Sequence, residues 1–189
     1  MKTALHKTLI ALCALCLQSM AAQAQDIALN TDITQWALQT YNLGAEMTVG
    51  NRSTVALNTF VNDKPYWHKD MKMIGLQPEY RYYFGGRPMY HHFVGVAAVA
   101  TDYNITWKNK NYDGFAAGAG ITFGYVAALS KRWNIDAHAG VGLVVYHHTE
   151  TLEGHPMLET DIPSFAADGY TGYTILPTKI GITISYILR

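Results

Sequence analysis

The sequence predicts an all-β protein, an eight-stranded antiparallel up-and-down transmembrane β-barrel. Residues 115–146 alternate between apolar and small or polar side chains along two long segments. Short turns alternate with longer polar connections along the chain, and a secretory signal peptide precedes the first expected strand. Together these features are typical of barrels in the bacterial outer membrane.

The two segments in residues 115–146 carry different side chains on their two expected faces. Every second residue is apolar, as in Phe115, Ile121 and Phe123. The residues between them are mostly small, including Gly118, Gly120, Gly124, Gly140 and Gly142. Period-two alternation over about ten residues per segment predicts strands whose apolar face meets lipid.

Eight segments show strand patterns, and they are expected at 28–38, 42–50, 53–62, 73–84, 92–105, 113–128, 133–147 and 175–188. The connections at 50–52, 85–89 and 129–132 are short, and the first two contain glycine or proline at turn positions. The connections near 63–72, 106–112 and 148–174 are longer and more polar. This alternation predicts turns on the periplasmic side and loops outside the cell. We also expect Pro78 to cause a β-bulge, because proline cannot donate a ladder hydrogen bond.

Residues 1–24 have the features of a signal peptide. Lys2 and Lys7 form a basic start, residues 9–17 are apolar, and Ala22-Gln23-Ala24 is a small-x-small cleavage site. We therefore expect export to the bacterial outer membrane and a single barrel domain at residues 25–189. Both cysteines, Cys13 and Cys16, lie in the signal peptide, so no disulfide is expected in the mature domain.

Composition excludes several other classes of protein. Without Lys2 and Lys7, 12 of the 14 basic residues remain against 14 acidic ones, so the expected mature net charge is about −2. No basic stripe of the kind required for nucleic-acid binding is present. A soluble lipocalin-like barrel is the main alternative fold. The glycine-rich non-apolar face argues against it, because a water-facing wall would be rich in lysine and glutamate.

The expected last strand and the aromatic residues add two further signals. Residues 179–186 alternate polar and apolar side chains and end at Tyr186. This pattern resembles the C-terminal signal read by the barrel assembly machinery. Aromatic residues gather near the expected short turns, as in an interfacial girdle, namely Tyr80, Tyr82, Tyr83, Phe84, Tyr90, Phe93 and Trp133.

Four stretches of the chain carry a resemblance to a known family. Residues 76–84, 112–125, 131–136 and 177–181 resemble the domain-of-unknown-function 3575 family. These are small outer-membrane β-barrels of Gram-negative bacteria, broadly similar to the OmpA transmembrane and OmpX-like group. The resemblance spans nearly all of the chain after residue 24. It implies fold and location but no established activity.

Charged residues at inward-facing positions form the candidate site. Glu79 and Arg81 are two residues apart, so they share a face, and alternation with Tyr80 and Tyr82 turns that face inward. A buried carboxylate and guanidinium must be paired. We expect a structural ion-pair network filling the lumen, with further members Glu46, Asp136, His138 and Lys179. A catalytic or proton-conducting role for these groups is the alternative.

No catalytic, cofactor-binding or metal-binding residue is assigned from the sequence. The serines after the signal peptide, Ser53, Ser130, Ser164 and Ser185, have no local histidine motif of the lipid-modifying barrels. The pairs His91-His92 and His147-His148 point to opposite faces of a strand, so neither pair can chelate one metal. Eight strands also leave an interior just wide enough for side chains, which argues against a porin.

These observations favour a non-enzymatic protein of the outer membrane. We expect an envelope scaffold or surface-interaction protein that acts through extracellular loops and contacts an extracellular or envelope protein, in addition to outer-membrane lipids. The loop 148–174, with Phe165, Tyr170 and Tyr173, is the candidate contact surface. The alternatives are a lipid-modifying enzyme of the outer membrane and a soluble carrier of a ligand.

Overall fold

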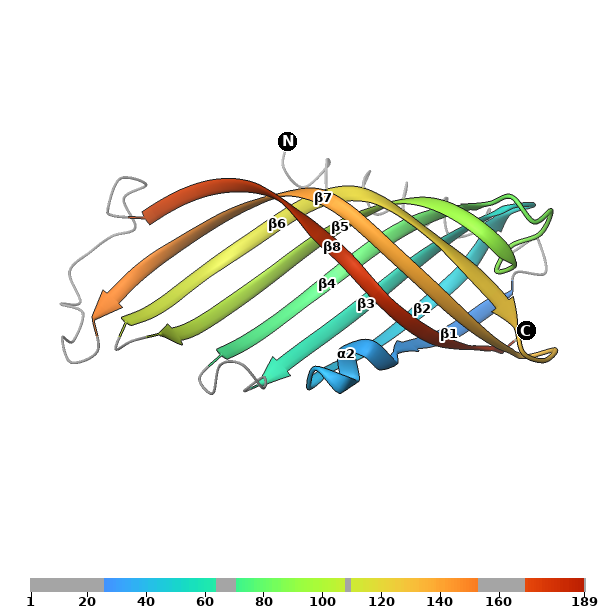
Figure 1. The fold of residues 1–189 in the computed structure, drawn as a ribbon, viewed down its shortest axis with the longest axis horizontal. Helices are drawn as coiled ribbons and strands as arrows, with labels where there is room; N and C mark the ends of the chain where they lie inside the picture. The colour runs from blue at the N-terminus through green and yellow to red at the C-terminus, as the bar shows by residue number, and fades with distance from the viewer. Residues whose placement is uncertain (1–25, 64–70, 108–109, 153–168, 189) are drawn as a thin grey trace, which may run out of the picture.

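The chain forms a closed barrel of eight antiparallel strands in sequential order, β1 to β8, which confirms the predicted eight-stranded up-and-down barrel. The computed structural model describes residues 26–63, 71–107, 110–152 and 169–188. The strands cross the barrel obliquely, and β1 pairs with β8 to close it (Figure 1). The short turns and both described chain ends lie at one end, the right-hand end of Figure 1, which we call the turn end. The opposite end is the loop end.

The strands differ strongly in length. The elements are β1 (Ile27–Asp32), α2 (Ile33–Ala37), β2 (Thr40–Gly50), β3 (Ser53–Asp63), β4 (Met71–Tyr83), β5 (His91–Trp107), β6 (Lys110–Ala128), β7 (Trp133–Leu152) and β8 (Gly169–Ile187). The strands β5 to β8 extend further toward the loop end than the sequence predicts. The expected connection at 106–112 is therefore part of the β5–β6 hairpin, which pairs as far as Trp107 and Lys110.

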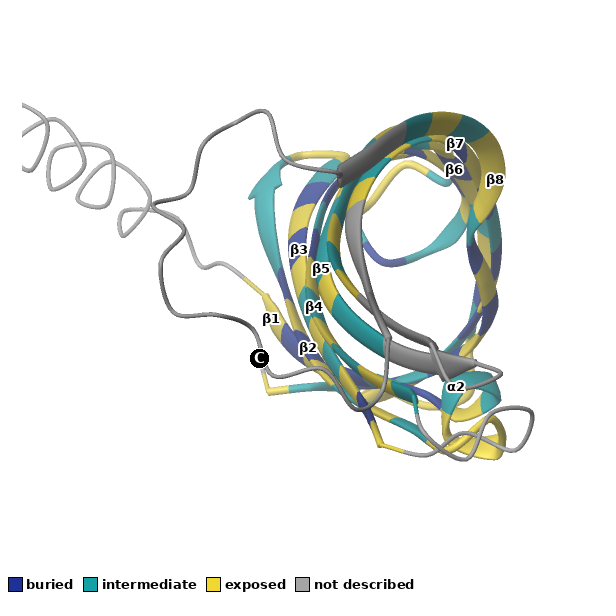
Figure 2. Cartoon of the chain, turned by 90° about the vertical axis from the view of Figure 1, so that its left-hand side faces the viewer, coloured by how far each residue is buried: buried dark blue, intermediate teal, exposed yellow. Residues whose placement is uncertain are grey.

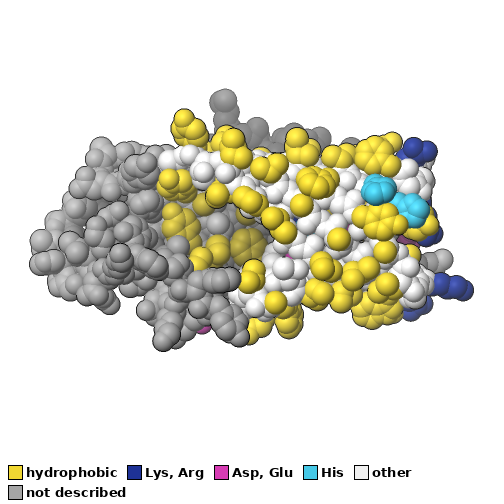
Figure 3. Space-filling view, viewed as in Figure 1, with side chains coloured by type: hydrophobic (Ala, Val, Ile, Leu, Met, Phe, Trp, Pro, Cys, Tyr) yellow, Lys and Arg dark blue, Asp and Glu magenta, His cyan; other side chains and the backbone are white. Residues whose placement is uncertain are grey.

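Side chains alternate between the two faces of the wall. Buried and exposed residues succeed each other along the strands (Figure 2), and hydrophobic side chains spread along the outside (Figure 3). The glycine-rich face of residues 115–146 points inward, whereas Phe115, Ile121 and Phe123 are exposed outside. Of the predicted aromatic girdle, Tyr83 and Phe93 instead point inward and are buried.

The first expected strand, 28–38, is wrong beyond Asp32. The chain leaves the sheet there and forms the short helix α2. The Asp32 carboxylate caps this helix by accepting hydrogen bonds from the backbone nitrogens of Thr34 (2.8 Å) and Gln35 (3.2 Å). In the described part of the chain, no helix is long and apolar enough to cross a membrane.

Because β1 is short, β8 pairs with it only over Thr183–Ile187. Among the described residues, no strand pairs with this edge of β8 closer to the loop end. The helix α2 lies at that position, between β8 and β2, and the Thr34 hydroxyl oxygen accepts a hydrogen bond from the Ile182 nitrogen (2.9 Å). We call the gap between β2 and β8 that α2 covers the seam.

The expected bulge at Pro78 is also wrong. The β4–β5 register is the same at Leu76 and at Glu79, so Pro78 is accommodated without an extra residue. The register shifts instead between β2 and β3, at Thr48 and Gly50, and between β7 and β8, where Gly140 pairs with Lys179 and Val141 pairs with Pro177. Pro177 lies near the unpaired edge of β8, and edge strands are where proline is tolerated.

Glycines allow β6 and β7 to approach closely on the inner face. A Cβ atom at Gly142 would lie 2.5 Å from the Ala119 carbonyl oxygen and 2.8 Å from the Gly120 Cα atom. These contacts are with backbone, which cannot turn aside. The small inner face therefore permits the sharp curvature of a narrow barrel.

Candidate functional site: the charged network inside the barrel

The structure brings all six sequence-predicted lumen residues together inside the barrel. They come from four strands and are all buried: Glu46 from β2, Glu79 and Arg81 from β4, Asp136 and His138 from β7, and Lys179 from β8. Each occupies an inward position of the alternation. We call these residues, with Asp32, the lumen network.

Arg81 is the centre of the network. Its Nη1 atom lies 2.9 Å from Asp136 Oδ2 and 3.4 Å from Glu46 Oε2, and its Nη2 atom lies 3.0 Å from Glu79 Oε2. The guanidinium group also lies 4.4 Å from the centre of the Phe93 ring. One planar cation therefore joins three carboxylates from three strands, a geometry that arginine provides and lysine does not.

Lys179 adds a second cation beside Glu79. Its Nζ atom lies 2.7 Å from Glu79 Oε2, and the Thr122 hydroxyl donates to Glu79 Oε1 at 2.6 Å. Glu79 thus has partners from β4, β6 and β8. Both of its oxygens are occupied, as a buried carboxylate requires.

Glu46 is stabilised by two hydroxyl groups. Thr54 and the phenol of Tyr83 donate to Glu46 Oε1 at 2.6 Å and 2.7 Å. Tyr83 in turn packs against Phe93, and these two rings form a buried cluster with Val126. The network therefore rests on an apolar layer on the side of the turn end.

His138 lies between two carboxylates. Its Nε2 atom is 3.4 Å from Asp32 Oδ2, and its Nδ1 atom is 3.6 Å from Asp136 Oδ1. Neither contact has hydrogen-bond geometry. Asp32 links the lumen network to the seam, because its other oxygen caps α2.

The network fills most of this part of the lumen. A cavity of about 10 Å³ remains beside Arg81, Lys179 and Gln35, which is about the space of one water molecule. In the described part of the chain, no group of three or more histidine, aspartate or glutamate side chains is arranged to hold a metal ion. In this arrangement, the single guanidinium group of Arg81 holds together carboxylates from strands on different sides of the barrel.

A model of the DUF3575 family, described as a protein of unknown function, matches residues 8–188. The chain belongs to the DUF3575 family. No curated protein and no solved structure matches it.

Three members of the site in this DUF3575 protein were not predicted from the sequence: Asp32, Thr54 and Thr122. Thr54 and Thr122 lie at inward positions in correctly expected strands, so alternation alone could have identified them. Asp32 was not predicted because the first strand was expected to continue to residue 38, through the residues that form α2. The N-cap pattern of Asp32 before Ile33-Thr34-Gln35 was the available signal.

The expected interaction loop differs from the structure in part. Phe165 lies outside the described residues. Tyr170 and Tyr173 lie on β8 rather than in a loop, because β7 and β8 remain paired as far as Thr149 and Gly169. Tyr173 points outward from the wall and is 80% exposed.

Proposed function

We propose that this DUF3575 protein is an integral protein of the bacterial outer membrane, exported by its N-terminal signal peptide. Its role is non-enzymatic, as an envelope scaffold or surface-interaction protein that acts through the loop end. The observation that carries this proposal is the apolar outer wall. The turn end then faces the periplasm and the loop end faces the outside of the cell.

A row of outward side chains shows the character of this wall. Val55, Tyr80, Val96, Ile121 and Val141 are neighbours on five successive strands, β3 to β7. Each is between 41% and 62% exposed. Monomeric soluble proteins rarely expose a continuous apolar surface larger than a few hundred Å². A lipid bilayer covers such a wall. The pairing of β1 with β8 closes the barrel, and α2 covers the seam where, among the described residues, β8 has no strand partner.

The inside of the barrel supports the same proposal against the soluble-carrier alternative. A soluble carrier has an apolar interior that holds its ligand and a charged exterior. Here the charged groups of the lumen network are inside, and the apolar groups are outside. This distribution is the reverse of that of a soluble barrel.

The described serine hydroxyls favour a non-enzymatic role. Ser53 Oγ accepts a hydrogen bond from Tyr80 OH (2.8 Å), and Ser130 Oγ accepts from the backbone nitrogen of Trp133 (3.2 Å). Ser185 is buried in the lumen. A serine nucleophile needs a histidine or another base within hydrogen-bond reach, and these three have other surroundings. Ser164 lies outside the described residues.

Fractionation of cells that express the chain tests the proposed location. We expect the protein in the outer-membrane fraction, extracted only by detergent, and with a faster gel mobility before boiling than after it. Recovery from the periplasm without detergent would instead support the soluble carrier.

A strain without the protein tests the role. We expect it to be more sensitive to detergents, and to be restored by Ser53→Ala and Ser185→Ala. If either variant folds correctly but does not restore detergent resistance, an enzymatic role is favoured.

A further inference from the structure

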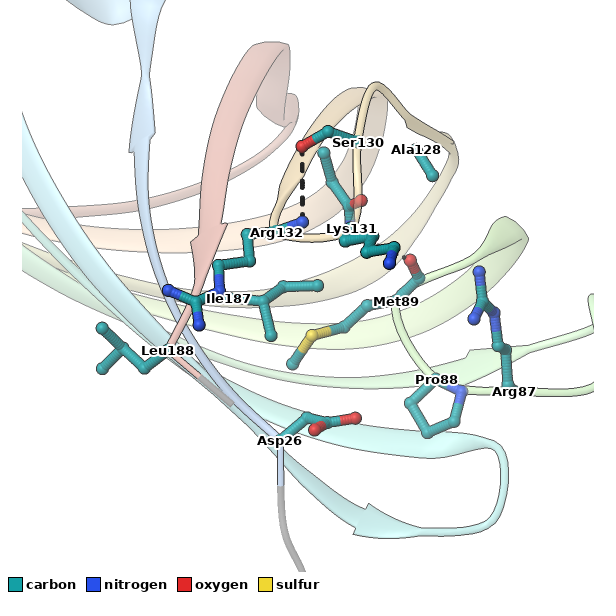
Figure 4. A pocket seen from close by; sticks show the side chains of 11 residues that line it. Asp26, Arg87, Pro88, Met89, Ala128, Ser130, Lys131, Arg132, Ile187 and Leu188 are labelled. Carbon is teal, nitrogen blue, oxygen red and sulfur yellow. Dashed lines mark hydrogen bonds between the residues drawn. The ribbon is translucent and has the colours of Figure 1, made fainter.

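A second hollow lies at the turn end, separate from the lumen network. It has a volume of about 780 Å³ and lies between the β4–β5 turn, the β6–β7 turn and the two described chain ends (Figure 4). Its basic side chains are Arg87, Lys131 and Arg132, and its one carboxylate belongs to Asp26. We call this hollow the turn-end cup.

The cup has a closed floor. Met89 and Asn134 are only 6% and 4% exposed, and Asn134 Nδ2 donates to the Met89 carbonyl oxygen at 3.1 Å. Beyond them lies the buried cluster of Tyr83, Phe93 and Val126. The cup is therefore a blind pocket and not the mouth of a continuous channel.

The arginines of the cup are held by aromatic residues rather than by carboxylates. The Arg87 guanidinium lies 4.3 Å from the centre of the Tyr90 ring, and Arg132 Nη1 donates to Tyr186 OH at 3.2 Å. Among the described residues, no carboxylate forms an ion pair with Arg87, Lys131 or Arg132. No described carboxylate therefore neutralises their positive charge.

Charge and size together define the ligand that fits. Among the described lining residues, three basic side chains outnumber one carboxylate, which favours an anionic ligand such as a phosphate monoester. An arginine guanidinium group can donate two parallel hydrogen bonds to phosphate oxygens, and a lysine ammonium group adds a further positive charge. The volume is within the range of pockets for small organic ligands and exceeds what inorganic phosphate needs. Met89 and Ile187 supply an apolar wall for the carbon part of such a ligand.

We propose that the turn-end cup is a binding site for an organic phosphate monoester. The phosphoryl group lies among the basic side chains of the cup, and the carbon skeleton lies against Met89 and Ile187. The ligand is either a soluble phosphate ester or the head group of a phosphomonoester lipid. The site does not depend on the proposed membrane location, so either proposal can fail without the other.

Calorimetric titration of the full chain in a zwitterionic detergent tests the proposal. The probes are glycerol 3-phosphate, inorganic phosphate, glycerol, and phosphatidic acid in mixed micelles. At about 150 mM salt, long-range attraction is screened, so saturable binding reports a defined site. We expect saturable binding of glycerol 3-phosphate or phosphatidic acid, and the one that binds identifies the source. Inorganic phosphate should bind more weakly and glycerol should not bind.

Two variants and a matched control locate the site. Arg87→Gln and Arg132→Gln should each weaken binding about tenfold or more, because each removes charge-assisted hydrogen bonds to the phosphoryl group. Arg52→Gln is the control, because Arg52 is an exposed arginine in a neighbouring turn and does not line the cup. Unchanged gel mobility before boiling verifies that each variant is folded. Absence of saturable binding by both esters, equal loss in Arg52→Gln, or equal affinity for inorganic phosphate would overturn the proposal.

Discussion

At the scale of single residues, Arg81 has the largest consequences for this barrel. It contacts Glu46, Glu79 and Asp136, which lie on β2, β4 and β7. Burying charges is costly, and mutual attraction offsets that cost only when all partners are present. The lumen network therefore makes the native arrangement depend strongly on one side chain.

Replacing Arg81 with methionine should destabilise the barrel by about 3–5 kcal/mol, because buried carboxylates lose their shared cation. The measurement is the free energy of unfolding in urea, or the temperature at which the folded band disappears on a gel. Arg52→Met is the control. It changes an exposed turn arginine and should stay within about 0.5 kcal/mol of the wild type. Equal stabilities of the two variants would show that the network does not contribute to stability.

The sequence predicted which residues belong to this network, but not which carboxylate pairs with which cation. Alternation places Glu79, Arg81, Asp136 and His138 on the inner face, and burial then demands pairing. Which carboxylate meets which cation depends on the stagger of strands that are far apart in sequence. Lys179 reaches Glu79 across the barrel, 100 residues away along the chain. No local pattern contains that information.

At the scale of elements, α2 replaces the part of β1 that the barrel lacks. Ile33 and Trp36 are exposed on its outer side, so the helix continues the apolar wall across the seam. Trp36 is fixed by a hydrogen bond from its Nε1 atom to Thr31 Oγ1 (2.8 Å) and by an edge contact with Tyr41. Toward the lumen, Gln35 lines the small cavity beside Arg81. The helix therefore closes the wall where backbone pairing ends.

Thr34 tests this role of α2. Thr34→Val keeps the shape of the side chain but removes the acceptor for the Ile182 nitrogen, so that amide should exchange with solvent about three- to tenfold faster. Hydrogen exchange followed by NMR measures this directly. Thr34→Ser keeps the acceptor and should leave the rate near the wild-type value. The Ser185 amide, in the paired part of β8, serves as an internal reference. An unchanged Ile182 rate in Thr34→Val would show that α2 does not protect the seam.

Sequence patterns predicted the long strands and failed at the short elements. Residues 115–146 have enough repeats of the alternation for their two strands to be unambiguous. Residues 33–37 are too few to separate a helical from a strand period, and their apolar residues fit both. The Pro78 prediction failed for a different reason. Proline removes one hydrogen bond, but the continuous pairing of β4 with β3 keeps the strand in register.

At the scale of the whole molecule, polarity is distributed in the reverse of a soluble protein. The charged lumen network lies inside, the apolar wall lies outside, and basic side chains gather at the turn end (Figure 3). Each part needs the others. The network occupies the described lumen around Arg81. In the proposed outer-membrane location, the apolar wall faces lipid and the turn-end cup faces water.

Ile121 offers the sharpest test of that distribution, because it lies outward at the middle of the wall between Val96 and Val141. Ile121→Arg should cost about 2–4 kcal/mol of folding free energy in lipid vesicles, since a charge at the bilayer centre loses its hydration. Leu129→Arg is the control, because Leu129 is similarly exposed but lies in the β6–β7 turn. It should change the folding free energy by no more than about 0.5 kcal/mol. If both variants are neutral, the wall faces water, because an exposed arginine costs nothing there. A cost confined to Ile121→Arg requires a surrounding medium that penalises charge at mid-height but not at the turns, and a bilayer has this property.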